Sequence, residues 1–113
     1  MDIQLQSSEE KNGAVTLSIQ GDIDMSTSPK VREQLAPLFQ KNQKAIVVDL
    51  SGVPYIDSSG IATLVEGLQW SHSSNNKFRL ASLTPAVKDV FEIARLLTVF
   101  EVFESKEEAL QEI

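Results

Sequence analysis

The stretch AIVVDLSGVPYIDSSGIATLVEGL, residues 45–68, decides the fold of this chain. Its first six residues are aliphatic and β-branched with almost no polar alternation, which is typical of a strand buried on both faces. Residues 51–54, Ser-Gly-Val-Pro, have the composition of a loop. Apolar residues then recur at the spacing of a helix that packs on a sheet, at Ile61, Leu64, Val65 and Leu68. We therefore predict a central strand, a loop and a helix in that order.

Residues 57–60, Asp-Ser-Ser-Gly, stand at the predicted start of this helix. Free backbone N–H groups and the positive end of the helix dipole favour an anion there. One interpretation is that Asp57 or Ser58 is the N-cap, because such residues are preferred caps. The other is that a serine here is phosphorylated and the helix end stabilises its phosphate. Spacing alone leaves both open.

Strand and helix patterns alternate along the rest of the chain. Alternating apolar residues on both sides of Asn12-Gly13 predict an N-terminal β-hairpin. Beyond it, the patterns predict helices over 28–40 and 58–73, strands over 45–50, 78–83 and 99–103, and helices beginning at 85 and 106. Pro37 lies inside the first helix and predicts a kink or an early end there. The order is ββαβαβαβα, which indicates an α/β fold with a mainly parallel sheet.

Composition narrows the function. At 113 residues, with 42% hydrophobic and 23% charged residues, the chain has the size and composition of one soluble domain. It has no apolar run long enough for a membrane span and no signal-peptide pattern, and it has no cysteine, so we expect a cytoplasmic protein. Its net charge of −6 disfavours nucleic-acid binding, because an acidic domain repels phosphate backbones. We expect a protein partner.

The central stretch resembles the signature of a known family. Residues 47–53 (VVDLSGV) and 56–61 (IDSSGI), with GDID at 21–24 and LTPAV at 83–87, are similar in order and spacing to the STAS-domain anti-sigma factor antagonists of bacteria. The resemblance spans nearly the whole chain and implies a single STAS domain over residues 1–113.

What the resemblance implies for function centres on Ser58, with Ser59 as its neighbour. Ser58 matches the serine that an anti-sigma factor serine kinase phosphorylates in this family, and a serine phosphatase removes the phosphate. The kinase brings ATP and Mg²⁺, so the chain needs no catalytic residue, cofactor or metal of its own. The unphosphorylated antagonist binds the kinase and the phosphorylated form is released. The expected partner-binding residues are Asp22, Ile23, Asp24, Pro54, Tyr55, Ile56, Asp57, Ser58, Ser59 and Gly60.

Two other functions remain open. The same fold also serves as an accessory STAS subunit of lipid-transporting ABC systems, which needs no phosphorylation. A two-component receiver domain would use Asp49 as phospho-acceptor, with Asp22 and Asp24 holding Mg²⁺ at the strand ends. A receiver would also need a lysine that closes its last strand, whereas Lys106 lies in a predicted capping box.

Two residues outside the motif carry expectations of their own. Trp70 lies about 180° around its helix from Ile61, so we expect it to point away from the core. It would then either pack on a neighbouring loop or take part in an interface. Arg95 stands where the family commonly has a glycine after the third helix. A left-handed residue at that position costs a non-glycine side chain energy, which favours a different turn here.

Overall fold

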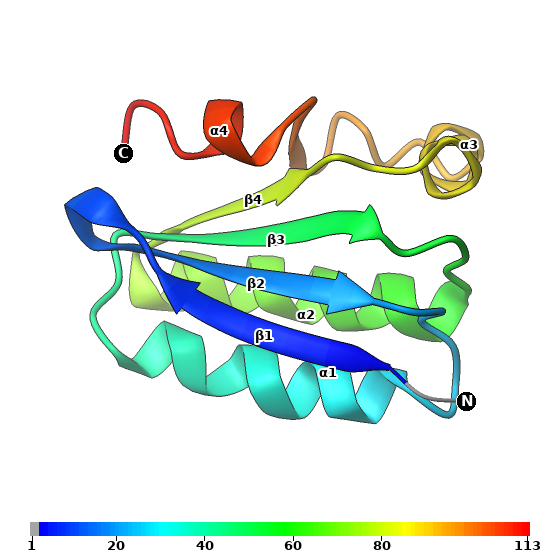
Figure 1. The fold of residues 1–113 in the computed structure, drawn as a ribbon, viewed down its shortest axis with the longest axis horizontal. Helices are drawn as coiled ribbons and strands as arrows, with labels where there is room; N and C mark the ends of the chain where they lie inside the picture. The colour runs from blue at the N-terminus through cyan, green and yellow to red at the C-terminus, as the bar shows by residue number, and fades with distance from the viewer. Residues whose placement is uncertain (1–2) are drawn as a thin grey trace.

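A five-stranded sheet forms the centre of the computed structural model, which describes residues 3–113 (Figure 1). The strands lie in chain order across the sheet, and only the first pair is antiparallel. They are β1 (Gln4–Glu9), β2 (Ala14–Gln20), β3 (Ala45–Gly52), β4 (Lys77–Ala81) and β5 (Glu101–Phe103). The predicted N-terminal hairpin and the mainly parallel sheet are therefore confirmed.

Three helices connect the parallel strands and a fourth follows the last strand, in the predicted order. They are α1 (Ser28–Leu35), α2 (Ser58–Ser74), α3 (Pro85–Ile93) and α4 (Lys106–Ala109), with short 3₁₀ helices η1 (Lys11–Gly13) in the hairpin and η2 (Ala36–Gln40) after α1. The change from α1 to η2 occurs next to Pro37, as the sequence predicts, because proline removes a helical hydrogen bond.

Both faces of the sheet are covered at β3, which explains the apolar run Ala45–Val48 at its start. Figure 1 shows α1 and α2 along one side of the sheet and α4 on the opposite side. Ile46, Val48 and Leu50 belong to the large core cluster, whereas Val47 packs with Ala81 and Ala109 of α4 in a second, small cluster. Successive residues of β3 thus point to different cores and both are buried.

Trp70 packs on the helical layer, and the expectation that it points away from the core is wrong. Its ring meets the buried Phe39 edge-on, with the centroids 5.7 Å apart, and the Arg32 guanidinium carbon lies 5.6 Å from the ring centroid. The expectation from the angle around α2 took only the sheet into account as a packing surface. Phe39 belongs to η2, the 3₁₀ turn that contains Pro37, and supplies a second surface beside α2.

The turn after α3 keeps a left-handed residue although Arg95 occupies the position. Arg95 has φ +60°, and the Leu96 N–H donates to the Phe91 carbonyl at 2.8 Å, as in a Schellman motif. The expectation of a different turn is therefore wrong. Closure of the turn outweighs the steric penalty of one side chain in this conformation.

Arg95→Gly is expected to raise the free energy of unfolding by about 0.5–1 kcal/mol, because glycine adopts this conformation without strain. Urea unfolding followed by the fluorescence of Trp70, the single tryptophan, measures the change. Lys88→Gly is the matched control: it lies exposed inside α3 and should lose about 1 kcal/mol. A stability of Arg95→Gly equal to or below wild type would contradict the expectation.

Candidate functional site

The N-terminus of α2 is capped by Asp57. One carboxylate oxygen accepts hydrogen bonds from the Ser59 N–H at 2.9 Å and the Gly60 N–H at 3.2 Å, and the Ser59 hydroxyl donates to the same oxygen at 2.5 Å. The hydroxyl of Ser59, together with the backbone donors, holds the pKa of the Asp57 carboxyl below its usual range. Of the two caps that spacing allowed, the structure therefore selects Asp57.

Ser58 and Ser59 are neighbours in different environments. Ser59 is half-buried and its hydroxyl is engaged by Asp57. Ser58 is the first residue of α2 and is exposed. Among the side-chain hydrogen bonds of residues 3–113, none uses the Ser58 hydroxyl. A second protein that reaches this helix end therefore meets Ser58 with its hydroxyl free.

Two loops at this end of the sheet are joined by a backbone bridge. Ile23 and Ile56 pair as in a parallel sheet, with the Ile23 N–H donating to the Tyr55 carbonyl at 2.9 Å. The Asp57 N–H donates in turn to the Ile23 carbonyl at 3.1 Å. The loop after β2 and the loop after β3 therefore form one surface beside Ser58.

Gly60 lets the helix start sit directly on this bridge. A Cβ atom added at Gly60 would lie 2.6 Å from Ile56 Cγ1 and 2.7 Å from Ile23 Cγ2, which is closer than van der Waals contact permits. Ile23, Ile56 and Gly60 are all buried. Of the ten residues expected at the partner surface, these three support it from beneath, and the other seven reach solvent to different degrees.

The loop after β2 is shaped by the Asp24 carboxylate. One of its oxygens accepts hydrogen bonds from the Ser26 hydroxyl at 2.7 Å and from the N–H groups of Ser26 and Thr27 at 2.9 and 3.2 Å. The Ser26 hydroxyl is the main cause that lowers the pKa of Asp24. This compact turn directs Met25 outward, and its side chain is 79% exposed.

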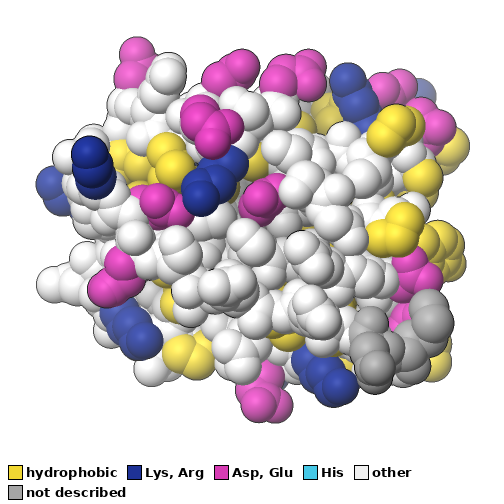
Figure 2. All heavy atoms as spheres, in the orientation of Figure 1, with side chains coloured by type: hydrophobic (Ala, Val, Ile, Leu, Met, Phe, Trp, Pro, Cys, Tyr) yellow, Lys and Arg dark blue, Asp and Glu magenta, His cyan; other side chains and the backbone are white. Residues whose placement is uncertain are grey.

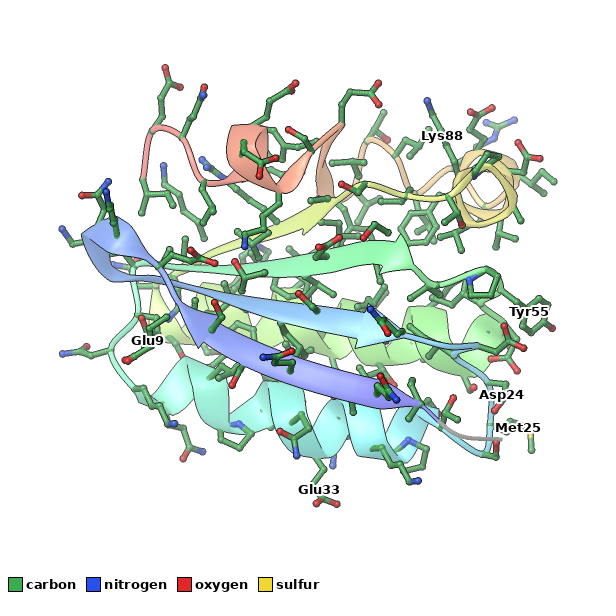
Figure 3. The ribbon with its side chains drawn as sticks, in the orientation of Figure 1. Glu9, Asp24, Met25, Glu33, Tyr55 and Lys88 are labelled. Carbon is green, nitrogen blue, oxygen red and sulfur yellow. The ribbon has the colours of Figure 1, made fainter. Side chains whose placement is uncertain are left out.

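Met25 is a surface residue that the sequence motif did not include. Figure 3 shows it beside Asp24 at the same edge of the molecule as Tyr55, which is 51% exposed. Figure 2 shows hydrophobic side chains along this right-hand edge, with acidic side chains between them. A methionine inside a run of turn residues, 24–29 (DMSTSP), was the available signal, because such a turn leaves no core for it to enter.

The aspartates of the receiver hypothesis do not form a metal site. Asp49 is half-buried within β3, and its carboxylate accepts the Ser51 N–H at 3.0 Å. Within residues 3–113, no group of three or more His, Cys, Asp or Glu side chains is placed to hold a metal ion. The N-terminal hairpin is also foreign to a receiver, whose first strand is parallel to its neighbours. Geometry and topology therefore both contradict the receiver hypothesis.

No helix in the described part of the chain has the length and apolar character of a membrane span. His72, near the end of α2, is exposed.

Comparisons with known proteins establish a family for this chain through a family model. The family model of the STAS domain matches residues 6–109. The anti-sigma-B factor antagonist of Listeria monocytogenes serovar 1/2a is 28% identical over 102 residues, which cover 90% of each chain. A crystal structure of an anti-sigma factor antagonist from Mycobacterium paratuberculosis superposes with a TM-score of 0.86 at 24% identity, covering 96% of this chain and 92% of that one.

A third relative has been solved in a phosphorylated form. The Bacillus cell fate determinant SpoIIAA in that form aligns with a TM-score of 0.73 at 17% identity, covering 95% of this chain and 96% of the other. At such identities the two solved structures establish the fold, and the family model establishes the membership. With its hairpin, parallel sheet and capped Asp-Ser-Ser-Gly segment, this chain belongs to the STAS domain family.

Proposed function

We propose that this chain is an anti-sigma factor antagonist that is switched by phosphorylation of Ser58. In its unphosphorylated form it binds an anti-sigma factor serine kinase and so frees a sigma factor. The names of its relatives support the general function. The observation that carries the finer proposal is the contrast between the free, exposed hydroxyl of Ser58 and the engaged hydroxyl of Ser59.

The chain acts as substrate and ligand, and the kinase supplies the chemistry. The Ser58 Oγ attacks the γ-phosphorus of ATP that the kinase holds with Mg²⁺, and the bond from that phosphorus to the bridging oxygen of ADP breaks. The hydroxyl proton passes to a base on the kinase. The products are phosphoserine and ADP, so this chain needs no catalytic residue, cofactor or metal of its own.

A phosphate on Ser58 would bring its charge to the start of α2, where Asp57 already takes two backbone donors. A phosphoserine adds about −1.5 to −2 charge at pH 7. The Ser59 and Gly60 N–H groups, which would otherwise donate to a phosphate at a helix start, already donate to the Asp57 carboxylate. The phosphate therefore stays on the surface beside Asp57 and Asp24, where it repels acidic groups and disturbs a docked partner.

The partner surface consists of the residues around Ser58 that reach solvent. It includes the exposed Pro54 and Tyr55 and the half-buried Asp22 and Asp24, and Met25 joins them because of its exposure. A serine phosphatase would restore the hydroxyl. We place the protein in the cytoplasm, as a single STAS domain over residues 1–113.

Phosphate mapping tests this function. The protein is incubated with ATP, Mg²⁺ and the candidate anti-sigma kinase of the same genome, and intact-mass spectrometry with peptide mapping locates the product. We expect one phosphate in wild type, none in Ser58→Ala, and one in the matched control Ser59→Ala. Phosphate that persists in Ser58→Ala refutes the site. A lack of phosphate with every such kinase, together with co-purification of a transport ATPase, would favour the accessory-subunit function.

A further inference from the structure

Thr84 stands at the N-cap of α3 but does not cap it. A threonine at this position ordinarily accepts a hydrogen bond from an N–H group of the first helical turn. The Thr84 side chain makes no such bond. Its hydroxyl instead donates to the carbonyl of Val53, with 2.7 Å between the oxygens. The side chain thus serves a segment 31 residues away rather than its own helix.

Val53 begins the loop that leads to Ser58. It is fully buried, and its own N–H donates to the Leu50 carbonyl at 3.0 Å. Pro54 follows and has no N–H, so it cannot anchor the loop by a backbone donor. The next backbone bonds are those of Tyr55 and Asp57 with Ile23. The exposed Pro54-Tyr55 pair therefore lies between two anchors, the Thr84 hydroxyl and the Ile23 bridge.

We propose that Thr84 is a positioning residue for docking of the kinase at Ser58. This inference rests on the proposed function and adds to it a residue outside the partner surface. Without the hydroxyl, the buried Val53 carbonyl lacks its donor, and the peptide turns toward water. The Pro54-Tyr55 pair then leaves the conformation that the partner recognises, and binding must first restore it.

Steady-state phosphorylation kinetics with the antagonist as varied substrate separate positioning from folding. Thr84→Val keeps the shape of the side chain and removes the donor. We expect its KM to rise about three- to tenfold, the factor that corresponds to one neutral hydrogen bond, with kcat unchanged. Thr84→Ser keeps the hydroxyl and should retain the wild-type KM. Thr98→Val, at an exposed threonine, is the matched control and should match wild type.

An unchanged KM in Thr84→Val, or an equal rise in Thr84→Ser, would overturn the inference. A fall in kcat alone would overturn it as well, because a docking residue acts on the encounter with the kinase.

Hydrogen–deuterium exchange tests the same inference without a kinase. The amides of Val53, Tyr55, Ile56 and Asp57 should exchange faster in Thr84→Val than in wild type, while those of α1 stay unchanged. If wild type takes no phosphate, the proposed function fails, and exchange alone then decides whether Thr84 holds the loop. Equal exchange in residues 53–57 overturns the inference whatever the kinase does.

Discussion

A Ser58→Asp protein is expected to bind the anti-sigma kinase at least ~100-fold more weakly than wild type. The substitution places a permanent carboxylate at the start of α2, beside the Asp57 carboxylate that already occupies the Ser59 and Gly60 N–H groups. Unpaired like charges at an interface cost several kcal/mol, and a 100-fold loss corresponds to about 2.7 kcal/mol. Isothermal titration calorimetry with the nucleotide-bound kinase measures the change.

Ser58→Asn separates charge from shape. Asparagine has nearly the same volume as aspartate and no charge, so this control should bind within about threefold of wild type if charge is the cause. The loss in Ser58→Asp should also shrink as salt rises, because the side chain is exposed and its charge is screened. Equal losses in both variants would show that shape, and not charge, releases the kinase.

Arg79→Met is expected to lower the free energy of unfolding by about 2–4 kcal/mol, because each hydrogen bond to a charged group contributes about 1.5–3 kcal/mol and methionine restores part of the packing. The Arg79 side chain is almost fully buried beneath the C-terminal segment. Its Nη1 donates to the carbonyls of Ala109 and Gln111 at 2.9 and 2.6 Å, and its Nε pairs with Glu101 at 3.0 Å. Its guanidinium carbon lies 5.1 Å from the centroid of the Phe103 ring.

Lys77→Met is the matched control for Arg79→Met. Lys77 lies on the same strand and also contacts the C-terminal segment, but its exposed ammonium makes one bond, to the Glu112 carbonyl at 3.1 Å. Its loss should stay within about 0.5 kcal/mol. Urea unfolding of both variants, followed by Trp70 fluorescence, gives the comparison. A loss in Arg79→Met no larger than in Lys77→Met would contradict the role of the buried guanidinium.

The fold follows from local patterns, and these were visible in the sequence. The apolar run of β3, the helical stripe of α2 and the turn at Asn12-Gly13 each depend on neighbours within a few residues. Strong periodicity therefore predicted the strands of the sheet, the helices that follow them, and the order of these elements along the chain. The α-helix ends next to Pro37, as the sequence predicts, because the missing N–H of proline removes a hydrogen bond within a single helical turn.

The contacts that shape the candidate site, local as well as long-range, depend on three-dimensional geometry that sequence patterns do not contain. Asp57 and Ser58 are both residue types that are preferred as N-caps. Only the bonds that the Ser59 hydroxyl and the backbone N–H groups make in the structure select Asp57. The bond from Thr84 to Val53 joins segments whose proximity is set by the whole sheet. Met25 was missed because exposure in a turn is decided by which side chains the turn engages.

Arg79 is the strongest case of this limit. A cation in a strand pattern indicates a solvent-facing position, yet this one is buried because the chain returns across the sheet and offers it carbonyl groups. The residues near Arg79 in the sequence do not indicate that residues 109–111 are its partners.

Recognition through carbonyl groups has a consequence for how this domain can diverge. Every residue carries a carbonyl, so Arg79 and Lys77 cannot distinguish one side chain from another at Gln111 or Glu112. Substitutions there leave the contact intact and can accumulate freely over evolutionary time. A single inserted or deleted residue after Ala109 instead shifts the carbonyls of Gln111 and Glu112 out of register, so selection acts on the length of this segment more than on its side chains.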